Sequence, residues 1–224
     1  MNLSPAAWRR VLPFLLFMLL LGLRGIAPGD ATWGFDTRWL YALNLPLVGG
    51  LLLWWWRDYG ELHRQNAPTL REVLLAVAVG VVVFALWIRL DAPWMQIGES
   101  TAGFVPRDAQ GQLLWPLIAV RWLGATLLVP VMEELFWRSF LMRWLQVPQF
   151  EALPPRRVGA KALVLSTFVF MLAHPLWLAA IVAGLAYALL YRHSGRLWSA
   201  VIAHAVTNGL LGVWVVQTGQ WQFW

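Results

Sequence analysis

Seven long apolar runs, each bounded by charged or turn-forming residues, divide this sequence. A helix needs about 20 mostly apolar residues to cross the ~30 Å hydrocarbon core of a bilayer, and most of these runs approach that length. They predict an all-α fold, a polytopic membrane helical bundle of about 7–8 transmembrane helices. The runs cover about residues 10–26, 39–56, 70–88, 115–142, 159–174, 176–191 and 197–217.

The composition supports a membrane protein and excludes several other classes. Of the 224 residues, 60% are apolar and only 12% are charged, whereas a soluble domain carries about 25% charged residues. We therefore expect one integral membrane domain over residues 1–224, with a helical core at about 110–217 that carries the candidate site and accessory helices at 1–109. The chain has no cysteine, which excludes disulfides, thiolate nucleophiles and cysteine-based zinc sites.

The basic residues predict the orientation of the chain. With the N-terminus in the cytoplasm, eleven of the 17 basic residues fall on the cytoplasmic side and four on the other, as the positive-inside rule requires. This distribution explains the net charge of +6, and because the charge is not clustered on one face we expect no nucleic-acid partner. The eleven are Arg9, Arg10, Arg57, Arg64, Arg71, Arg143, Arg156, Arg157, Lys161, Arg192 and Arg196, and the four are Arg24, Arg38, Arg89 and Arg107.

The fourth apolar run is too long to cross a bilayer as one straight helix. A continuous helix from Leu113 to Leu145 would be on the order of 50 Å long. Pro116 and Pro130 offer places to break or kink it, and we expect one end to lie along the membrane surface. Residues 89–114 predict an irregular external loop, and residues 143–158 a cytoplasmic turn.

Three of the predicted spans contain ionisable side chains, which cost roughly 2.5–3.5 kcal/mol each at a bilayer centre and are therefore candidate functional residues. The first set is Glu133, Glu134 and Arg138. Glu134 and Arg138 are four residues apart on a helix and are expected to form an ion pair. Glu133 points about 100° away from Glu134 and lacks that partner, so a desolvated Glu133 suits a general base. The alternative is a purely structural charge cluster.

The second set is Phe170 and His174, again four residues apart, so the phenyl ring is expected to pack on the imidazole. Pro175 follows directly and restricts the backbone there. A single histidine at a helix end is also typical of a cap or an interfacial residue, and that alternative stays open.

The third set is His204 and Asn208, which share a helix face. Both side chains can donate hydrogen bonds to one small target, as an oxyanion hole requires. The alternative is an interhelical hydrogen-bond patch, worth about 0.6 kcal/mol per contact in membranes. Taken together, a base, a second polar group that positions water and two oxyanion donors on three helices make a complete hydrolytic set.

These three motifs resemble those of the intramembrane proteases grouped as CAAX proteases and bacteriocin-processing enzymes, also called the CPBP or Abi family. The matching patterns are Glu-Glu-x-x-x-Arg, Phe-x-x-x-His and His-x-x-x-Asn, over about residues 120–210. The resemblance implies that Glu133 activates water, that His174 helps to hold it, and that His204 and Asn208 stabilise the oxyanion. Glu134, Arg138 and Phe170 would support the site, and no cofactor would be needed.

The resemblance also implies a partner and a location. The substrate would be a membrane-associated protein or peptide, cleaved near its C-terminus or in a membrane-proximal segment within the lipid bilayer. The short chain and the tryptophan-rich fourth run look like the branch associated with exosortase and PEP-CTERM protein sorting. That branch would place the protein in a bacterial inner membrane, with an exosortase-type sorting system as a partner.

Other functions are compatible with the same residues. In a zinc-dependent membrane metalloprotease, Glu133, His174 and His204 would bind Zn²⁺, although the His-Glu-x-x-His helix motif is absent. A transporter would use the same groups as a proton relay, but no internal repeat is found. In a scaffold they would only pack helices.

The expected depths of the three sets differ. Counted along the helices from their cytoplasmic ends, Glu133 and His204 lie roughly 10 Å deep and His174 about 20 Å deep. A hydrolytic site requires the three sets to meet, so we expect a tilted or broken helix, or a shifted span boundary, to bring His174 to the depth of Glu133 and His204.

Overall fold

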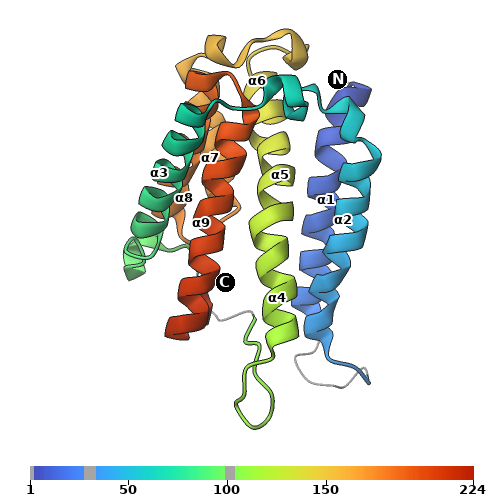
Figure 1. Cartoon of the computed structure of the whole chain (residues 1–224), viewed down its shortest axis with the longest axis vertical. Helices are drawn as coiled ribbons and strands as arrows, with labels where there is room; N and C mark the ends of the chain where they lie inside the picture. Colours follow the sequence, from blue (N-terminus) through green and yellow to red (C-terminus); the bar gives the residue numbers. More distant parts are fainter. Residues whose placement is uncertain (1–2, 28–33, 99–103) are drawn as a thin grey trace.

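The computed structural model describes residues 3–27, 34–98 and 104–224. Within these ranges long helices run side by side along one axis (Figure 1), and no β-strand occurs beyond an isolated bridge between Arg107 and Leu113. The α-helices are α1 (Pro5–Ile26), α2 (Asn44–Trp54), α3 (Leu70–Trp87), α4 (Trp115–Leu123), α5 (Val129–Glu134), α6 (Met142–Trp144), α7 (Ala160–Leu172), α8 (Trp177–Ser194) and α9 (Leu197–Thr218). The 3₁₀ turn η2 (Thr37–Leu43) precedes α2.

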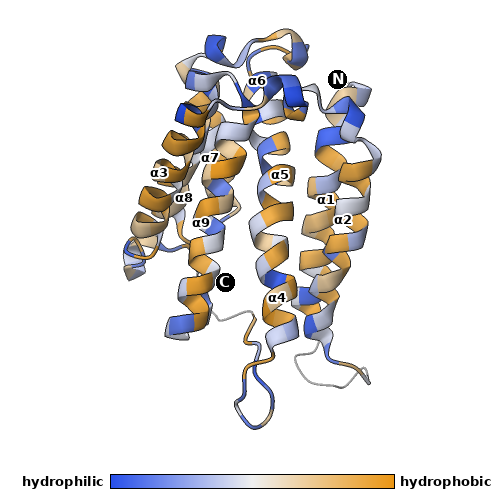
Figure 2. Cartoon of the chain, viewed as in Figure 1, coloured by the Kyte–Doolittle hydropathy of each residue, from blue (hydrophilic) through white to orange (hydrophobic). Residues whose placement is uncertain are grey.

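The surface of the bundle is typical of a membrane protein. Apolar residues cover the long helices, and hydrophilic residues gather at the two ends (Figure 2). Ile26, Leu53 and Trp54 point outward and stay more than 70% exposed. Four helical segments are long and apolar enough to cross a membrane, namely Pro5–Ile26, Leu70–Trp87, Trp115–Trp144 and Leu197–Thr218, and Ala160–Leu172 is apolar but shorter. The all-α fold is thus confirmed, whereas the count of seven or eight spans and the cytoplasmic N-terminus stay predictions.

Local sequence signals explain where two of these helices begin and end. Thr69 and Glu72 form a reciprocal capping box at the start of α3, each side chain bonding the backbone N–H of the other residue. At the end of α8, Gly195 adopts φ +74°, a left-handed conformation that glycine adopts without steric cost. The following α9 therefore begins after a tight turn and runs back beside α8.

The predicted break in the fourth run does not occur. Residues Trp115–Trp144 form one helical column, about 45 Å long, in which π-helical turns η7 (Gly124–Leu128) and η8 (Leu135–Leu141) connect α4, α5 and α6. Pro116 lies in the first turn, where its missing N–H is not needed. Pro130 follows η7, in which the Val129 N–H donates to the Gly124 carbonyl five residues back. This wider turn lets the column continue past the proline.

The N-terminal helices pack directly against the column rather than standing apart from it. Phe14 of α1 stacks on Phe136 with ring centres 4.1 Å apart. At the same end of the bundle Arg10 bonds Glu61 at 2.8 Å, and Ser139 and Arg143 bond each other at 2.9 Å. Burial opposes ionisation of Glu61, but the charge of Arg10 and the hydrogen bonds from Arg10 and Ser139 outweigh it and lower the pKa of that carboxyl.

α3 and α9 approach each other closely at Gly80. A Cβ added there would lie 2.5 Å from the Ala203 carbonyl oxygen and 2.8 Å from the Val206 Cβ. The Gly80 carbonyl also accepts a hydrogen bond from the Thr207 hydroxyl at 2.9 Å. This contact holds α3 against the helix that carries His204.

Replacing Gly80 by alanine is therefore expected to destabilise the protein by about 1–3 kcal/mol through overpacking. The measurement is thermal unfolding in detergent. Gly50→Ala is the matched control, because nothing lies within 4 Å of a Cβ at that helical position. Equal melting temperatures for the two variants would show that the α3–α9 contact is loose.

Candidate active site

The four predicted catalytic residues line one cavity of about 180 Å³. Glu133 reaches it from α5, His174 from the turn after α7, and both His204 and Asn208 from α9. α5 and α9 lie beside each other in the middle of the bundle (Figure 1). The four side chains reach the same cavity despite the difference in depth that counting along the helices predicts.

Glu133 is the carboxylate of the pair that faces the cavity. Its side chain is largely buried, with the residue 9% exposed. The Trp137 indole N–H, one turn further along the column, donates to its Oε2 at 3.2 Å. Among the described residues Glu133 forms no ion pair, so its charge is held only by a neutral donor. A carboxylate in this state is available as a proton acceptor.

Glu134 is completely buried and bridges two helices. Its Oε1 accepts from Arg138 Nη1 at 3.0 Å, which confirms the predicted i, i+4 ion pair. The same oxygen accepts from His204 Nδ1 at 2.8 Å. Because Nδ1 is occupied in this way, only Nε2 of His204 is left for a ligand. Glu134 therefore fixes the orientation of His204 as well as neutralising Arg138.

His174 is held by its backbone and by aromatic rings. Its Nδ1 lies 2.8 Å from the Phe170 carbonyl oxygen, so Nδ1 carries the proton and Nε2 is left unoccupied. The Phe170 ring packs on the imidazole with centres 4.4 Å apart, as the sequence predicts. Trp87 of α3 meets the same imidazole edge-on at 5.8 Å.

Asn208 lines the cavity but is not wholly free. Its Nδ2 donates to the Ala125 carbonyl oxygen at 2.9 Å, which belongs to the π-helical turn η7. A carboxamide nitrogen carries two protons, so one remains for a ligand. The sequence pattern places Asn208 on the same helix face as His204, which lines the cavity, but does not indicate this bond to the column.

Several residues that support the site could not be identified from the sequence. Tyr187 of α8 stacks under His204 with ring centres 4.9 Å apart and donates its hydroxyl to Thr207 at 2.8 Å. Trp137 holds Glu133. Arg121 of α4 also lines the cavity. The four-residue spacings of Trp137 to Glu133 and of Arg121 to Ala125 place each pair on one helix face. Many aromatic and basic residues share such spacings, so these spacings alone do not identify Trp137 or Arg121 as site residues.

The zinc alternative names Glu133, His174 and His204 as ligands of one metal ion. Within the part of the chain that the structure describes, no group of three or more histidine, cysteine, aspartate or glutamate side chains is arranged to hold a metal ion. Glu133, His174 and His204 line the same cavity without forming such a group, and Nδ1 of His204 is bonded to Glu134. The zinc alternative stays a prediction that the chelator experiment described below would test.

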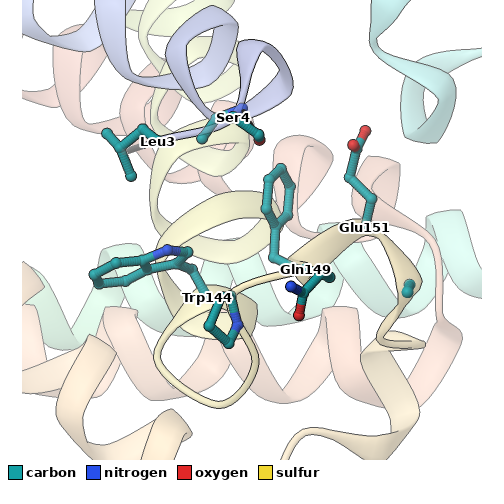
Figure 3. A pocket seen from close by; sticks show the side chains of 9 residues that line it. Leu3, Ser4, Trp144, Gln149 and Glu151 are labelled. Carbon is teal, nitrogen blue, oxygen red and sulfur yellow. Dashed lines mark hydrogen bonds between the residues drawn. The ribbon is translucent and has the colours of Figure 1, made fainter. Parts of the chain in front are cut away.

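A larger cavity, of about 440 Å³, lies at the start of α1 against the turn that follows α6. Figure 3 shows Leu3 and Ser4 on one side of it and Trp144, Gln149 and Glu151 on the other. Its wall contains no histidine and only the one carboxylate, so it lacks the groups that acid–base chemistry requires. The smaller cavity is the candidate active site.

Comparison with known protein families gives a match to part of the chain. Residues 115–210 match the family model described as type II CAAX prenyl endopeptidase Rce1-like. The matched segment begins in α4 and ends in α9, and it contains all seven residues of the three motifs. No curated protein and no solved structure gave a significant match.

Proposed function

We propose that this protein is an intramembrane endopeptidase that uses a glutamate-activated water. The premise is that residues 115–210 carry the domain of a membrane protease of the Rce1-like CAAX endopeptidase type. The observation that carries the proposal is the arrangement of the cavity. Glu133 faces it without a cation partner among the described residues, and His174, His204 and Asn208 surround the same space.

Glu133 would act as the general base. Water held between Glu133 and Nε2 of His174 attacks the carbonyl carbon of the scissile peptide bond, and Glu133 takes its proton. The Trp137 indole keeps the carboxylate in place. When the tetrahedral intermediate breaks its C–N bond, Glu133 returns the proton to the leaving amine, so the products are a carboxylic acid and an amine.

His204 and Asn208 would stabilise the oxyanion that forms in between. With Nδ1 bonded to Glu134, His204 is oriented so that its Nε2 would donate to the oxyanion. Asn208 supplies its second amide proton. Donors fixed in advance in a cavity of low dielectric contribute about 10²–10³ in rate each, and the bonds to Glu134 and Ala125 provide that fixation.

The substrate would be a membrane-associated protein or peptide, cleaved near its C-terminus or beside its membrane segment. The apolar exterior of the bundle supports this, because large exposed apolar surfaces mark contact with a membrane or with apolar partners. A bacterial inner membrane and an exosortase-type sorting partner are proposed from the sequence resemblance alone. We propose no metal cofactor.

Mapping of new peptide termini tests the proposal. The purified protein in lipid nanodiscs is incubated with detergent-solubilised membrane proteins, and the new termini are identified by mass spectrometry, with the same mixture lacking the protein as the control. We expect new termini close to apolar segments, formed at the same rate in EDTA. Cleavage that stops in EDTA and resumes with Zn²⁺ would contradict the metal-free mechanism, and a complete absence of new termini would contradict the protease.

A further inference from the structure

The active-site cavity extends to a second charged residue, Arg121 in α4. Its guanidinium lies among aromatic rings, with the central carbon 4.9 Å from the ring centres of Tyr41 and Phe104 and 5.5 Å from that of Trp224. Such cation–π contacts tolerate a buried cation but do not neutralise it. Arg24 lies 5.4 Å from the same Phe104 ring and adds a second positive charge nearby.

Arg121, which is half-buried, differs from the buried arginines in having no carboxylate partner among the described residues. Arg10 pairs with Glu61, Arg138 with Glu134 and Arg143 with Glu61. No described carboxylate forms an ion pair with Arg121, and its Nε donates to nothing. The Trp224 indole N–H, in the ring stacked on it, is also buried without an acceptor. Buried donors are normally satisfied, so this end of the cavity is prepared for an anionic acceptor.

The π-helical turn η7 brings Arg121 onto the same wall as Glu133. The two residues are twelve positions apart, which in an uninterrupted α-helix would turn their side chains about 120° from each other. A π turn accommodates one extra residue and so reduces the angle to about 20°. Arg121, Ala125, Val129 and Glu133 accordingly line the cavity in one row.

We propose that Arg121, together with the Trp224 indole N–H, binds a carboxylate of the peptide substrate and so determines which peptide bond reaches Glu133. This proposal rests on the proposed function, because it takes the ligand of Arg121 to be the peptide substrate of the protease. A guanidinium in an apolar wall recognises a carboxylate through charge-assisted hydrogen bonds. The carboxylate belongs either to the C-terminus of the substrate or to an acidic side chain.

The distance along the column predicts where that carboxylate lies. Twelve helical residues correspond to about 18 Å, and an extended peptide advances about 3.3 Å per residue. The carboxylate is therefore about five residues from the scissile bond. The aromatic residues at this end of the cavity would accommodate the apolar side chains in between.

Peptide binding to the inactive Glu133→Gln protein tests the proposal without requiring cleavage. The probes are fluorophore-labelled Ala-Leu-Ala-Leu-Ala-Leu peptides, one with a free C-terminal acid, one with a C-terminal amide, and an amide in which glutamate replaces the last leucine. Affinity is measured by fluorescence anisotropy in phosphatidylcholine nanodiscs. We expect the acid to bind about ten to a hundred times more tightly than the amide.

Substitutions at Arg121 separate binding from a structural role. Adding Arg121→Gln should remove the difference between acid and amide, Arg121→Lys should retain part of it, and Arg57→Gln, at an exposed position, should leave it unchanged. A residue that only packs the aromatic rings would alter the melting temperature but not this ratio. Trp224→Phe, which removes one donor, should lower the ratio.

The outcomes distinguish the possible ligands. Tight binding of the glutamate-containing amide assigns the carboxylate to a side chain, and binding of the free acid alone assigns it to the C-terminus; both support the proposal. Equal affinity for all three peptides overturns the proposal. Arg121-dependent binding of the anionic lipid phosphatidylglycerol, together with equal affinity for the acid and amide peptides, also overturns it. Acid-selective binding without any cleavage by the unmodified protein would overturn the protease and leave the Arg121 site standing.

Discussion

Glu133→Gln is expected to reduce the rate of peptide hydrolysis by about 10²–10⁴-fold, the range that general acid–base catalysis contributes. Glutamine has nearly the same shape and can still accept the Trp137 indole N–H through its carbonyl oxygen. It cannot take a proton from water at neutral pH. The variant should therefore lose activity while it inserts and folds like the unmodified protein. The measurement is the rate at which new termini appear in the assay with membrane proteins.

Two controls show whether the loss is chemical. Glu151→Gln removes a carboxylate that is 55% exposed, and it should leave the rate unchanged. The melting temperature of Glu133→Gln in detergent should stay close to that of the unmodified protein, because Glu133 forms no ion pair among the described residues. An active Glu133→Gln enzyme would contradict the mechanism in which Glu133 is the general base.

The helical architecture could be predicted from the sequence because membrane spans carry a strong local signal. Apolar length and bounding charge are properties of single segments, and each of the seven predicted runs is helical in the structure. The Glu134–Arg138 pair and the Phe170–His174 contact followed from four-residue spacing alone. Such contacts lie within one helix or its end, so they do not depend on how the helices pack.

The features that the sequence did not predict depend on packing between helices or on small changes of helix geometry. Pro130 indicated a break or a kink, and the structure shows no break, because a π-helical turn before the proline keeps the column continuous. No sequence pattern identifies a π turn, although it determines that Arg121 and Glu133 share a wall. The bond from His204 to Glu134 joins residues 70 positions apart, and neither motif indicates which of the two glutamates the histidine contacts.

Glu134→Gln is expected to lower the free energy of unfolding by about 3–5 kcal/mol, the effect of removing one partner from a buried ion pair. Glu134 is completely buried, and its Oε1 accepts from both Arg138 and His204. Glutamine keeps an acceptor oxygen but no charge, so the Arg138 guanidinium would be left with neutral partners among the described residues, including the Gly184 carbonyl at 3.4 Å and the Phe170 and Tyr187 rings. Arg138→Met should destabilise the protein comparably, since it leaves the glutamate charge unpaired.

The double variant Glu134→Gln/Arg138→Met distinguishes a pair from two independent contributions. Removing both charges leaves neither of them buried alone, and replacement of a buried ion pair by neutral groups is often nearly neutral for stability. The double variant should therefore be more stable than either single variant, as measured by thermal unfolding in detergent. Purely additive losses would show that the two side chains act separately.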